Sequence, residues 1–310
     1  MKNKKILITG GAGFFGSKLA QKFLENGNKV TVYDNLTFGD DGIKPFLDNK
    51  NYTFINGDVT DYIKLEPVVL QNDIIINLAA YVGEPICKAN KDSVYKINTD
   101  TTIYLAGLCN QHNKQFLFLS TCSNYGKNDS MVNEDSKLNP LGLYSDSKIK
   151  AENYIIDNVK SYLILRCSTL FGVSHRMRVD LTINQFLYEI NTFGFVSVYG
   201  EEAWRPYIHV EDACNIIIIA LESELKGVYN IGDESLNYTK KQIVDELLKF
   251  KDFKVEQVDW DDPRDYKVDF SKLHSKINYK IKFDLQTGIK ELSDHLDTEE
   301  FKNKKSIKNA

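Results

Sequence analysis

A tyrosine and a lysine stand four residues apart near the middle of the chain, at Tyr144 and Lys148. Residues four apart share one face of an α-helix, so this spacing places a phenol beside an ammonium group. A phenol with its ordinary pKa of about 10 is a poor base at neutral pH, and a nearby positive charge lowers that pKa. The pair is therefore predicted to remove a proton from a hydroxyl group. The alternative is a surface tyrosine beside a solvated lysine.

A glycine-rich segment near the N-terminus could hold phosphate groups. Gly11, Gly13 and Gly16 fit the pattern G-x-G-x-x-G, and Gly10, Gly13 and Gly16 also fit G-x-x-G-x-x-G. Such a turn brings the backbone N–H groups at the start of a helix close to a pyrophosphate. The residues of this turn predicted to contact a dinucleotide are Gly10, Gly13, Phe14, Phe15 and Gly16.

A carboxylate stands where the ribose of a bound dinucleotide needs one. Asp34 ends an apolar run, and a carboxylate there accepts hydrogen bonds from the ribose hydroxyls and repels the 2′-phosphate of NADP. Asn35 and Leu36 follow with no Arg or Lys beside them, so NAD is favoured over NADP. Together with the strand before the turn and the helix after it, these residues predict an NAD site.

These residues need a scaffold, and the chain carries alternating strand and helix patterns. The predicted strands cover residues 5–9, 29–33, 52–56, 73–78, 115–120, 162–166 and 227–231. The predicted helices run from the glycine turn to residue 25 and over 93–111, 143–158, 179–190, 211–222, 239–250 and 284–296. Strands separated by helices form βαβ units and a parallel sheet. The predicted fold class is α/β, a Rossmann-type doubly wound parallel sheet with a smaller α+β substrate-binding C-terminal region.

The chain divides into two predicted regions and a tail. Residues 1–166 and about 205–231 form the dinucleotide-binding region, and about 167–204 and 232–297 form the substrate-binding region. Residues 298–310 form a polar, frayed tail. Because no Pro/Ser-rich linker separates the two regions, we expect the second to pack onto the first.

Composition excludes several classes of protein. The 310 residues are 42% hydrophobic and 26% charged, as in ordinary globular proteins. A net charge of −4 argues against a nucleic-acid partner. The longest apolar run, residues 216–221, is too short to span a membrane. The five cysteines show no C-x-x-C spacing, so free thiols in a cytoplasmic protein are expected, with no disulfide and no metal site.

Arginine is scarce and unevenly placed. Only five of the 39 basic residues are arginines, and none lies in the first 165 residues. Such a lysine-rich chain suggests an AT-rich coding bias, so an arginine is expected where a bidentate grip on phosphate or carboxylate is needed. The five are Arg166, Arg176, Arg178, Arg205 and Arg264. Arg176 and Arg178, beside His175, are predicted to recognise substrate, and the alternative is loop cations or ion pairs with Asp180.

In order and spacing, these motifs resemble the extended short-chain dehydrogenases/reductases, in the nucleotide-sugar epimerase/dehydratase family of the UDP-galactose 4-epimerase type. Besides the glycine turn, Asp34, Asn98 and Tyr144 with Lys148, the matching segments are 57–59, 77–80, 121–126, 166–172, 205–212 and 264–265. Segments 171–181, 204–207 and 262–266 also resemble a narrower branch of bacterial surface-polysaccharide synthesis. That branch includes GDP-heptose C4 dehydrogenases and related epimerases.

The resemblance implies a role for each matching residue. Thr121, Tyr144 and Lys148 would be catalytic, with Tyr144 as the base and Lys148 on the nicotinamide ribose. Further cofactor contacts would come from Asn35, Asp58, Val59, Leu78, Ala79, Ala80 and Asn98, and Asn98 would also buttress the catalytic helix. Substrate contacts would come from Ser123, Thr169, Arg176, Arg178, Arg205 and Arg264, with Arg205 and Arg264 on the substrate diphosphate.

The implied activity is NAD-dependent oxidation of the C4 hydroxyl of a nucleotide-diphosphate sugar to a 4-keto intermediate, for surface-polysaccharide precursors. Hydride return to the other face would make a 4-epimerase, and release of the keto sugar a net C4 dehydrogenase. The 4,6-dehydratases of the family carry Asp-Glu where this chain has Cys122 and Ser123, so dehydration is not expected. Thr169 replaces the family's usual Asn, which leaves a uracil- or thymine-type nucleotide in doubt.

Two other functions stay open. One is a C3/C5-epimerase/4-reductase of a 4-keto nucleotide sugar, with Cys122 and His175 as acid and base. The other is a non-catalytic dinucleotide-sensing Rossmann protein, against which the Tyr144 and Lys148 pair argues.

A homodimer is the expected assembly. The helices predicted over 93–111 and 143–158 carry apolar residues beyond one buried stripe, and the family often dimerises through this helix pair. These residues are Ile103, Tyr104, Leu108, Ile149, Tyr154 and Ile155.

Overall fold

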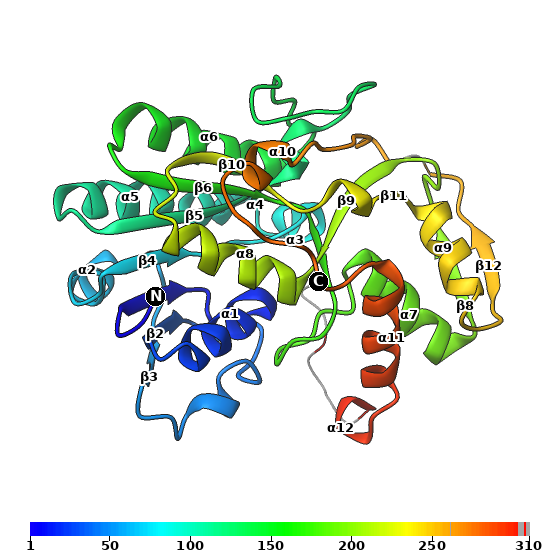
Figure 1. Ribbon diagram of the computed structural model, residues 1–310, viewed down its shortest axis with the longest axis horizontal. Helices are drawn as coiled ribbons and strands as arrows, with labels where there is room; N and C mark the ends of the chain where they lie inside the picture. The colour runs from blue at the N-terminus through cyan, green and yellow to red at the C-terminus, as the bar shows by residue number, and fades with distance from the viewer. Residues whose placement is uncertain (261, 303–306, 308–310) are drawn as a thin grey trace.

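The computed structural model describes residues 1–260, 262–302 and 307. Its largest element is a parallel sheet of seven strands in the order β10-β6-β5-β4-β1-β2-β3 (Figure 1). These strands are β1 (Lys5–Thr9), β2 (Lys29–Asp34), β3 (Tyr52–Asn56), β4 (Ile74–Asn77), β5 (Gln115–Thr121), β6 (Tyr162–Cys167) and β10 (Gly227–Ile231). The predicted doubly wound parallel α/β fold is confirmed.

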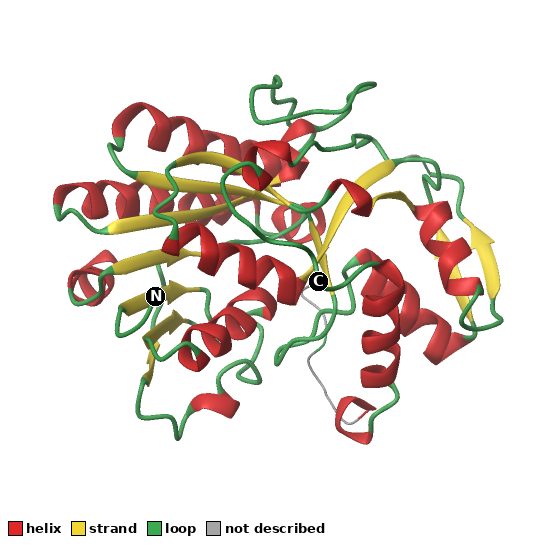
Figure 2. Cartoon of the chain, viewed as in Figure 1, coloured by secondary structure: helices red, strands yellow, loops and turns green. Residues whose placement is uncertain are grey.

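Helices cover both faces of this sheet (Figure 2). One face packs against α1 (Phe14–Glu25) and α8 (Val210–Glu222), and the other against α2 (Tyr62–Leu70), α5 (Thr101–Gln111) and α6 (Leu143–Asn158). Central strands buried on both faces are continuous apolar runs, as in β4. The strand order reverses between β1 and β4, and ligands of such sheets bind at the carboxyl ends of the strands there.

The helix predicted over residues 93–111 is interrupted. The chain instead forms α3 (Glu84–Ala89) and α4 (Lys91–Tyr95), then a π-turn over Lys96–Asp100 that leads into α5. Such π-turns occur often at functional sites.

No helix is predicted over α2, because Pro67 inside it is ordinarily a helix breaker. The bounds of α6 are those predicted.

A second region of smaller sheets and helices follows, on the right of Figure 1. One sheet joins β11 (Asn237–Thr239), β9 (Trp204–His209) and β7 (Thr169–Phe171), and the other joins β12 (Lys254–Gln257) and β8 (Phe195–Val198). The helices are α7 (Thr182–Phe193), α9 (Lys240–Leu248), α11 (Leu285–Leu296) and α12 (Glu299–Lys302), whereas α10 (Ser271–His274) packs against β10 of the large sheet. This region has its own apolar core. The domain boundaries stay a prediction.

The prediction that residues 298–310 are frayed is wrong for residues 299–302, which form α12. Phe301 in α12 is buried in the core of the second region, because its ring packs beside those of Tyr188 and His295. The rest of the predicted tail lies outside the described residues, apart from 307. Among the described residues, none of the helices combines the length and the apolar sequence that crossing a membrane requires.

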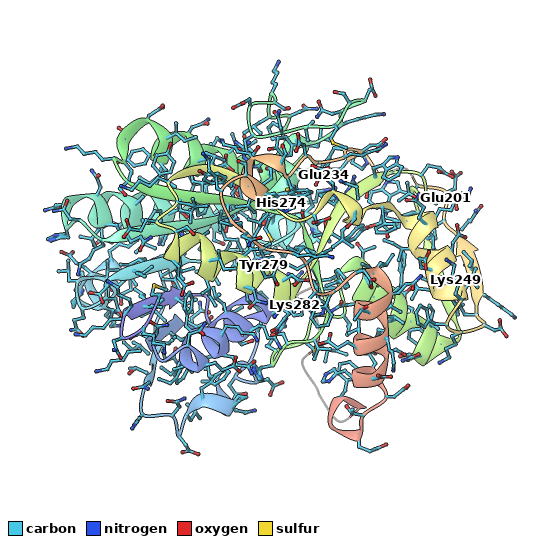
Figure 3. The ribbon with its side chains drawn as sticks, in the orientation of Figure 1. Glu201, Glu234, Lys249, His274, Tyr279 and Lys282 are labelled. Carbon is cyan, nitrogen blue, oxygen red and sulfur yellow. The ribbon has the colours of Figure 1, made fainter. Side chains whose placement is uncertain are left out.

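One buried carboxylate anchors the segment that leads to α11. Asp212 on α8 accepts hydrogen bonds from the Tyr279 hydroxyl (2.6 Å) and from the backbone N–H groups of Lys282 (2.9 Å) and Phe283 (3.0 Å). Figure 3 labels Tyr279 and Lys282 on this segment. The second region is thereby attached to the helix layer of the large sheet, as expected for a region that packs onto the first.

Candidate active site

The glycine turn lies between β1 and α1, at the carboxyl edge of the large sheet. Gly10 has a φ of 72°, and a Cβ there would lie 2.7 Å from the backbone nitrogen of Ala79. A Cβ on Gly16 would lie 2.5 Å from the carbonyl oxygen of Gly10, so α1 packs directly against the turn. No side chain of the described residues caps α1 at Gly13. Its first N–H groups can therefore bind a pyrophosphate.

Phe14 and Phe15, predicted to contact the cofactor, have side chains that point elsewhere. Both are buried in the apolar core between the sheet and its helices. Only their backbone N–H groups, at the start of α1, belong to the phosphate-binding turn.

Asp34 lies at the end of β2, beside the glycine turn. Its carboxylate accepts hydrogen bonds from the backbone N–H groups of Ala12 (3.1 Å) and Leu36 (2.9 Å). Desolvation raises its pKa. The two bonds orient the carboxylate toward the place where a dinucleotide on the turn would have its ribose, so the glycine cradle and Asp34 fit NAD.

The residues that follow β2 and β3 lie next to each other. Asn35 donates from Nδ2 to the Asp58 carboxylate (3.2 Å), and Asp58 also accepts from the Thr60 N–H (2.8 Å) and hydroxyl (2.7 Å). Val59 is buried against the sheet. The carboxyl ends of β2 and β3 thus form one continuous edge of polar groups.

Asn98 forms hydrogen bonds with the segments next to this edge. It is fully buried in the π-turn, donates to the Tyr81 carbonyl (3.0 Å) and the Ser147 hydroxyl (3.1 Å), and accepts from the Tyr81 N–H (2.9 Å). The segment Leu78, Ala79 and Ala80 lies between β4 and this contact. Asn98 therefore joins that segment to α6, in agreement with the buttressing role implied for it, and its contact with the cofactor stays a prediction.

Thr121 at the end of β5 and Tyr144 in the first turn of α6 meet at the same edge. The hydroxyl of Thr121 and the positive charge of Arg178 both act to lower the pKa of Tyr144. Desolvation outweighs both effects and raises that pKa. A desolvated phenol resists losing its proton, so a fall in the pKa of Tyr144, which was predicted with the positive nicotinamide bound beside it, stays a prediction.

Lys148 lies one turn along α6 from Tyr144. Its Nζ donates to the carbonyl of Leu119 (2.9 Å) and lies 4.6 Å from the centre of the Phe118 ring. Burial lowers the pKa of Lys148 to about 8. The ammonium is thus held at the end of β5, between the sheet and α6.

Arg178 comes from the second region and lies close enough to Tyr144 to affect its pKa. Its Nη2 is 2.6 Å from Oδ2 of Asp180. The ion pair with Asp180, which is the alternative drawn from the sequence, is present, and recognition of substrate by Arg178 stays a prediction.

Arg176 lies in a different place, although it is only two residues away. Its guanidinium is buried over the ring of Phe38, 5.4 Å from the ring centre, and Nε donates to the Phe38 carbonyl (3.4 Å). It is near enough to Asp34 to lower the pKa of that carboxyl. Arg176 is thus near the predicted ribose site as well as near Arg178, and its role in substrate recognition stays a prediction. No Arg or Lys follows Asp34 directly in the sequence, but in the folded chain Arg176 comes near it.

A cluster of three cations around one carboxylate lies in the second region. Oδ1 of Asp262 is 2.7 Å from Nη2 of Arg205 and 3.3 Å from Nε of Arg264, and its Oδ2 is 3.3 Å from Nζ of Lys240. The cations hold the pKa of Asp262 low despite its burial. Burial lowers the pKa of Lys240 to about 8. This surplus of positive charge can bind a diphosphate.

Arg205 and Arg264 were both predicted from the sequence to bind the diphosphate, but Lys240 was not. Lys240 follows Thr239, which caps α9, and no local pattern distinguishes it from Lys241, whose ammonium is exposed. The only available signal is the position of Lys240 in the first turn of α9, whose N-terminus the structure places beside β9.

Ser123 and Thr169 lie on different elements. Ser123 donates its N–H to Oγ1 of Thr121 (3.1 Å) and lies near enough to Tyr266 to act on the pKa of that phenol. Thr169 is half-buried on β7, in register with Tyr207 of β9. Their contacts connect the end of β5 and the edge of the second region.

Cys122 and His175, considered as an acid–base pair, do not lie together. Cys122 is buried, its Sγ donates to the Arg166 carbonyl (3.2 Å), and burial raises its pKa far above the ordinary value. His175 packs edge-on against Phe46 (5.0 Å) and bonds to Gln21 on α1 (2.9 Å). The pairing is therefore wrong. Within the described residues, no three His, Cys, Asp or Glu side chains are arranged to hold a metal ion.

Comparisons with known proteins agree with this geometry. UDP-glucuronic acid decarboxylase 6 of Arabidopsis thaliana is 29% identical over 307 residues, covering 93% of this chain and 87% of the relative. The solved UDP-N-acetylglucosamine 4-epimerase from Methanobrevibacter ruminantium, in complex with UDP-N-acetylmuramic acid, is 27% identical with a TM-score of 0.83, covering 95% of this chain and 100% of that one. UDP-glucuronic acid 4-epimerase from Bacillus cereus, with UDP-glucuronic acid and NAD, is 25% identical with a TM-score of 0.85, covering 94% and 98%.

The family match decides the identity. Residues 6–232 match the model of the NAD dependent epimerase/dehydratase family, a span that holds the glycine turn, Asp34, Thr121 and Tyr144 with Lys148. The chain therefore belongs to the NAD dependent epimerase/dehydratase family, among the extended short-chain dehydrogenases/reductases, and is an NAD-dependent enzyme of nucleotide-sugar chemistry.

Proposed function

We propose that this enzyme oxidises the C4 hydroxyl of a nucleotide-diphosphate sugar to a 4-keto intermediate, as a 4-epimerase or a net C4 dehydrogenase, in the synthesis of surface-polysaccharide precursors. The observation that carries the proposal is the hydrogen bond from Lys148 to the Leu119 carbonyl, which sets the part of α6 that carries Tyr144 and Lys148 against the end of β5, where Thr121 stands. The 4-epimerases among the similar solved structures support it.

Tyr144 removes the proton from the C4 hydroxyl, and Thr121 holds the phenol and the sugar hydroxyl in line. Arg178 favours the phenolate by its charge. Lys148 holds the nicotinamide ribose, and its positive charge also favours the phenolate. NAD, when bound, supplies the hydride acceptor. The glycine turn and Asp34 hold its pyrophosphate and ribose, and Asn35, Asp58, Val59, Leu78, Ala79 and Ala80 line the groove beyond them.

Arg205 and Arg264 bind the substrate diphosphate, and Lys240 adds a third positive charge. A diphosphate carries two or more negative charges, and the cluster around Asp262 carries three cations for one carboxylate. Ser123 and Thr169 lie on the path between this cluster and Tyr144, where they contact the sugar and the nucleotide.

The experiment is a substrate screen in which product configuration and NADH absorbance are followed together. A 4-epimerase inverts C4 without accumulating NADH, whereas a dehydrogenase accumulates NADH and a keto sugar. In the screen, Tyr144→Phe is expected to lower kcat by at least about 100-fold, because the base is lost. Tyr154→Phe, on the same helix, is the control. A fully active Tyr144→Phe enzyme would contradict the proposal.

A second candidate is a reaction on a nucleotide-linked uronic acid, with loss of CO₂ after oxidation at C4. The observation that favours it is the positive charge of Arg178, which acts on the phenol of Tyr144 and would attract a carboxylate of the substrate. Several similar proteins are named UDP-glucuronic acid decarboxylases. Including UDP-glucuronic acid in the screen and measuring released CO₂ separates this candidate from simple epimerisation.

The proposal includes a cytoplasmic homodimer that packs through α5 and α6. Of the six residues considered for that surface, Leu108 and Ile155 are buried in the protein's own core and do not contribute. Ile103, Tyr104, Ile149 and Tyr154 stay partly exposed. Light scattering of the purified protein tests the assembly.

A further inference from the structure

The helix that carries Tyr144 and Lys148 has no cap of its own. Gly142 precedes α6 with extended backbone, at a φ of −173° and a ψ of 177°, and has no side chain to accept a bond. Helix N-termini leave several N–H groups without partners, which a Ser, Thr, Asp or Asn side chain usually satisfies. The first turn of α6 must therefore find its acceptor elsewhere.

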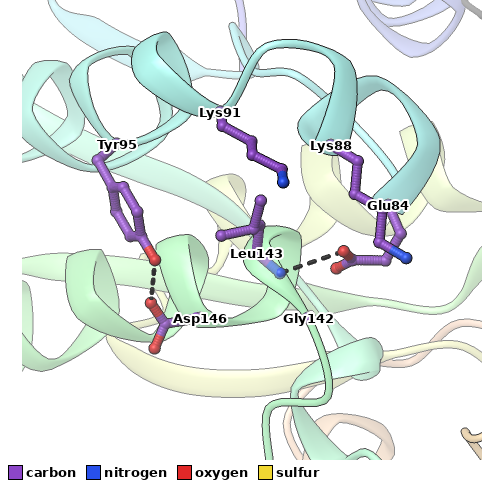
Figure 4. Close-up of a pocket in the computed structure, with 7 residues that line it drawn as sticks. All are labelled: Glu84, Lys88, Lys91, Tyr95, Gly142, Leu143 and Asp146. Carbon is purple, nitrogen blue, oxygen red and sulfur yellow. Dashed lines mark hydrogen bonds between the residues drawn. The ribbon is translucent and has the colours of Figure 1, made fainter.

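Glu84, far away in the sequence, supplies that acceptor. Its Oε2 accepts the backbone N–H of Leu143 (3.1 Å), and its Oε1 accepts the backbone N–H of Tyr144 (2.9 Å). Figure 4 shows the carboxylate of Glu84 reaching from α3 to the first turn of α6. Among the described residues, Glu84 forms no ion pair, so both of its oxygens serve this helix.

The glycine at position 142 makes this approach possible. A Cβ there would lie 2.1 Å from the carboxyl carbon of Glu84. Any residue with a capping side chain would therefore collide with the carboxylate that now caps the helix. A local cap and the remote cap exclude each other at this position, and the chain has the remote one.

The remote cap connects the base to the segment that leaves β4. Glu84 follows Gly83, whose φ is 98°, and begins α3 just after the stretch from Leu78 to Tyr81. The backbone of Tyr81 is held by Asn98 and by Sγ of Cys87 (3.4 Å). Glu84 thus joins a braced segment of the sheet edge to the backbone of Tyr144 itself.

The surroundings of Glu84 leave it free to act on α6. It lies in a surface pocket of about 620 Å³ that is also lined by Lys88, Lys91, Tyr95 and Asp146. In that pocket, Asp146 accepts from the Tyr95 hydroxyl (2.6 Å) and pairs with Lys150 (2.8 Å). The second carboxylate of the pocket therefore has its own partners and does not share the N–H groups of Leu143 and Tyr144.

We propose that Glu84 is a positioning residue for the reaction: its carboxylate fixes the first turn of α6 and so holds the phenol of Tyr144 in place at the carboxyl edge of the sheet. This inference rests on the proposed role of Tyr144 as the base. Misplacing a reacting group by about 1 Å can lower a rate by about 100-fold, so a bond to the backbone of that residue matters for kcat.

The experiment compares Glu84→Ala with Asp284→Ala, which removes a carboxylate cap from α11 in the second region, where Asp284 accepts the Thr287 N–H (2.8 Å). Glu84→Ala is expected to lower kcat by about 10-fold or more, with KM for the nucleotide sugar changed less than about 2-fold, since the diphosphate cluster is untouched. Asp284→Ala is expected to keep both constants. Hydrogen exchange, followed by mass spectrometry, should accelerate at Leu143 and Tyr144 only in Glu84→Ala.

Glu84→Gln provides the second variant. Its amide has one acceptor oxygen instead of two, so kcat and exchange at α6 are expected between those of the wild type and Glu84→Ala. A wild-type kcat in Glu84→Ala, or in Glu84→Gln if the former does not fold, overturns the inference even if exchange accelerates. A fully active Tyr144→Phe enzyme would instead refute the proposed function, and the exchange data would still report whether Glu84 caps α6.

Discussion

Two buried clusters each pair an arginine with a carboxylate, and they differ in charge balance. In the first, Nη2 of Arg166 lies 2.8 Å from Oε2 of Glu152, between β6 and α6. Glu152 also accepts from Asn124 (2.8 Å), and Nη1 of Arg166 donates to the Tyr125 hydroxyl (3.0 Å). One positive charge meets one negative charge, and the remaining bonds come from neutral groups.

The second cluster, around Asp262, has more positive than negative charge. Arg205, Arg264 and Lys240 share one carboxylate, and Nη2 of Arg205 is buried without a well-directed hydrogen bond among the described residues. Burying unbalanced charge is costly unless a partner arrives. A buried arginine alone therefore does not indicate a ligand site, whereas a surplus of buried charge does.

The largest expected effect is on the balanced cluster. Replacing Arg166 with Met leaves Glu152 as a buried, uncompensated charge, so the free energy of unfolding should fall by about 3–5 kcal/mol. Urea denaturation measures this loss. Arg264→Met is the control, since Asp262 keeps two other cations, and it should cost clearly less. Equal losses in the two variants would remove the distinction between the clusters.

A smaller effect, on binding, is expected at the unbalanced cluster. Arg205→Met removes a charged bond to the diphosphate worth about 1.5–3 kcal/mol, so affinity for a nucleoside diphosphate should fall by roughly 10- to 150-fold. Calorimetric titration with UDP and GDP, in parallel, measures it. Arg166→Met, measured without urea on the protein that is still folded, should bind the nucleoside diphosphate as the wild type does. If Arg205→Met binds as well as the wild type, the diphosphate lies elsewhere.

The smallest effect is a pH dependence from Lys240. Burial lowers its pKa to about 8, so its charge is present below pH 8 and lost above it. A bound diphosphate favours the charged form, and affinity should therefore fall, by at most about 10-fold, from pH 7 to pH 9. Because the unfolded chain keeps this proton up to its ordinary pKa of about 10.5, the same group makes the free energy of unfolding rise between pH 8 and 10.5.

Calorimetry at pH 7 and pH 9 checks the binding part of this prediction. Lys240→Met should bind less tightly at pH 7 and show little change with pH, whereas Lys241→Met, at the exposed neighbour, should keep the wild-type slope. The same slope in Lys240→Met and the wild type would assign the pH dependence to another group.

Elements with strong local patterns were predictable from the sequence. β1, β3, β10 and α6 have the predicted bounds, because apolar runs and helical spacing are properties of neighbouring residues. The strands β8 and β12 were not predicted, since β12 is exposed along its whole length and carries no apolar alternation. The π-turn at Asn98 was also missed, because it depends on the buried bonds of Asn98 to Tyr81 and Ser147.

The candidate site shows the same division. The glycine turn, Asp34 and the spacing of Tyr144 and Lys148 are local motifs. Arg176 and Arg178 stand in one loop but have different partners, Phe38 and Asp180, which no spacing rule can reveal. The desolvation that raises the pKa of Tyr144 could not be predicted either, because it depends on all the atoms that surround the phenol.

The sequence by itself determined the sheet, the dinucleotide turn, the family and the pair of residues proposed for proton transfer, since these follow from short-range pattern. Only the tertiary structure decided that Arg176 lies beside Asp34, that Lys240 joins Arg205 and Arg264 around Asp262, and that Glu84 caps the helix of Tyr144. Charge balance and remote capping involve side chains that are distant along the chain, and their energies depend on burial and distance, which exist only once the chain has folded.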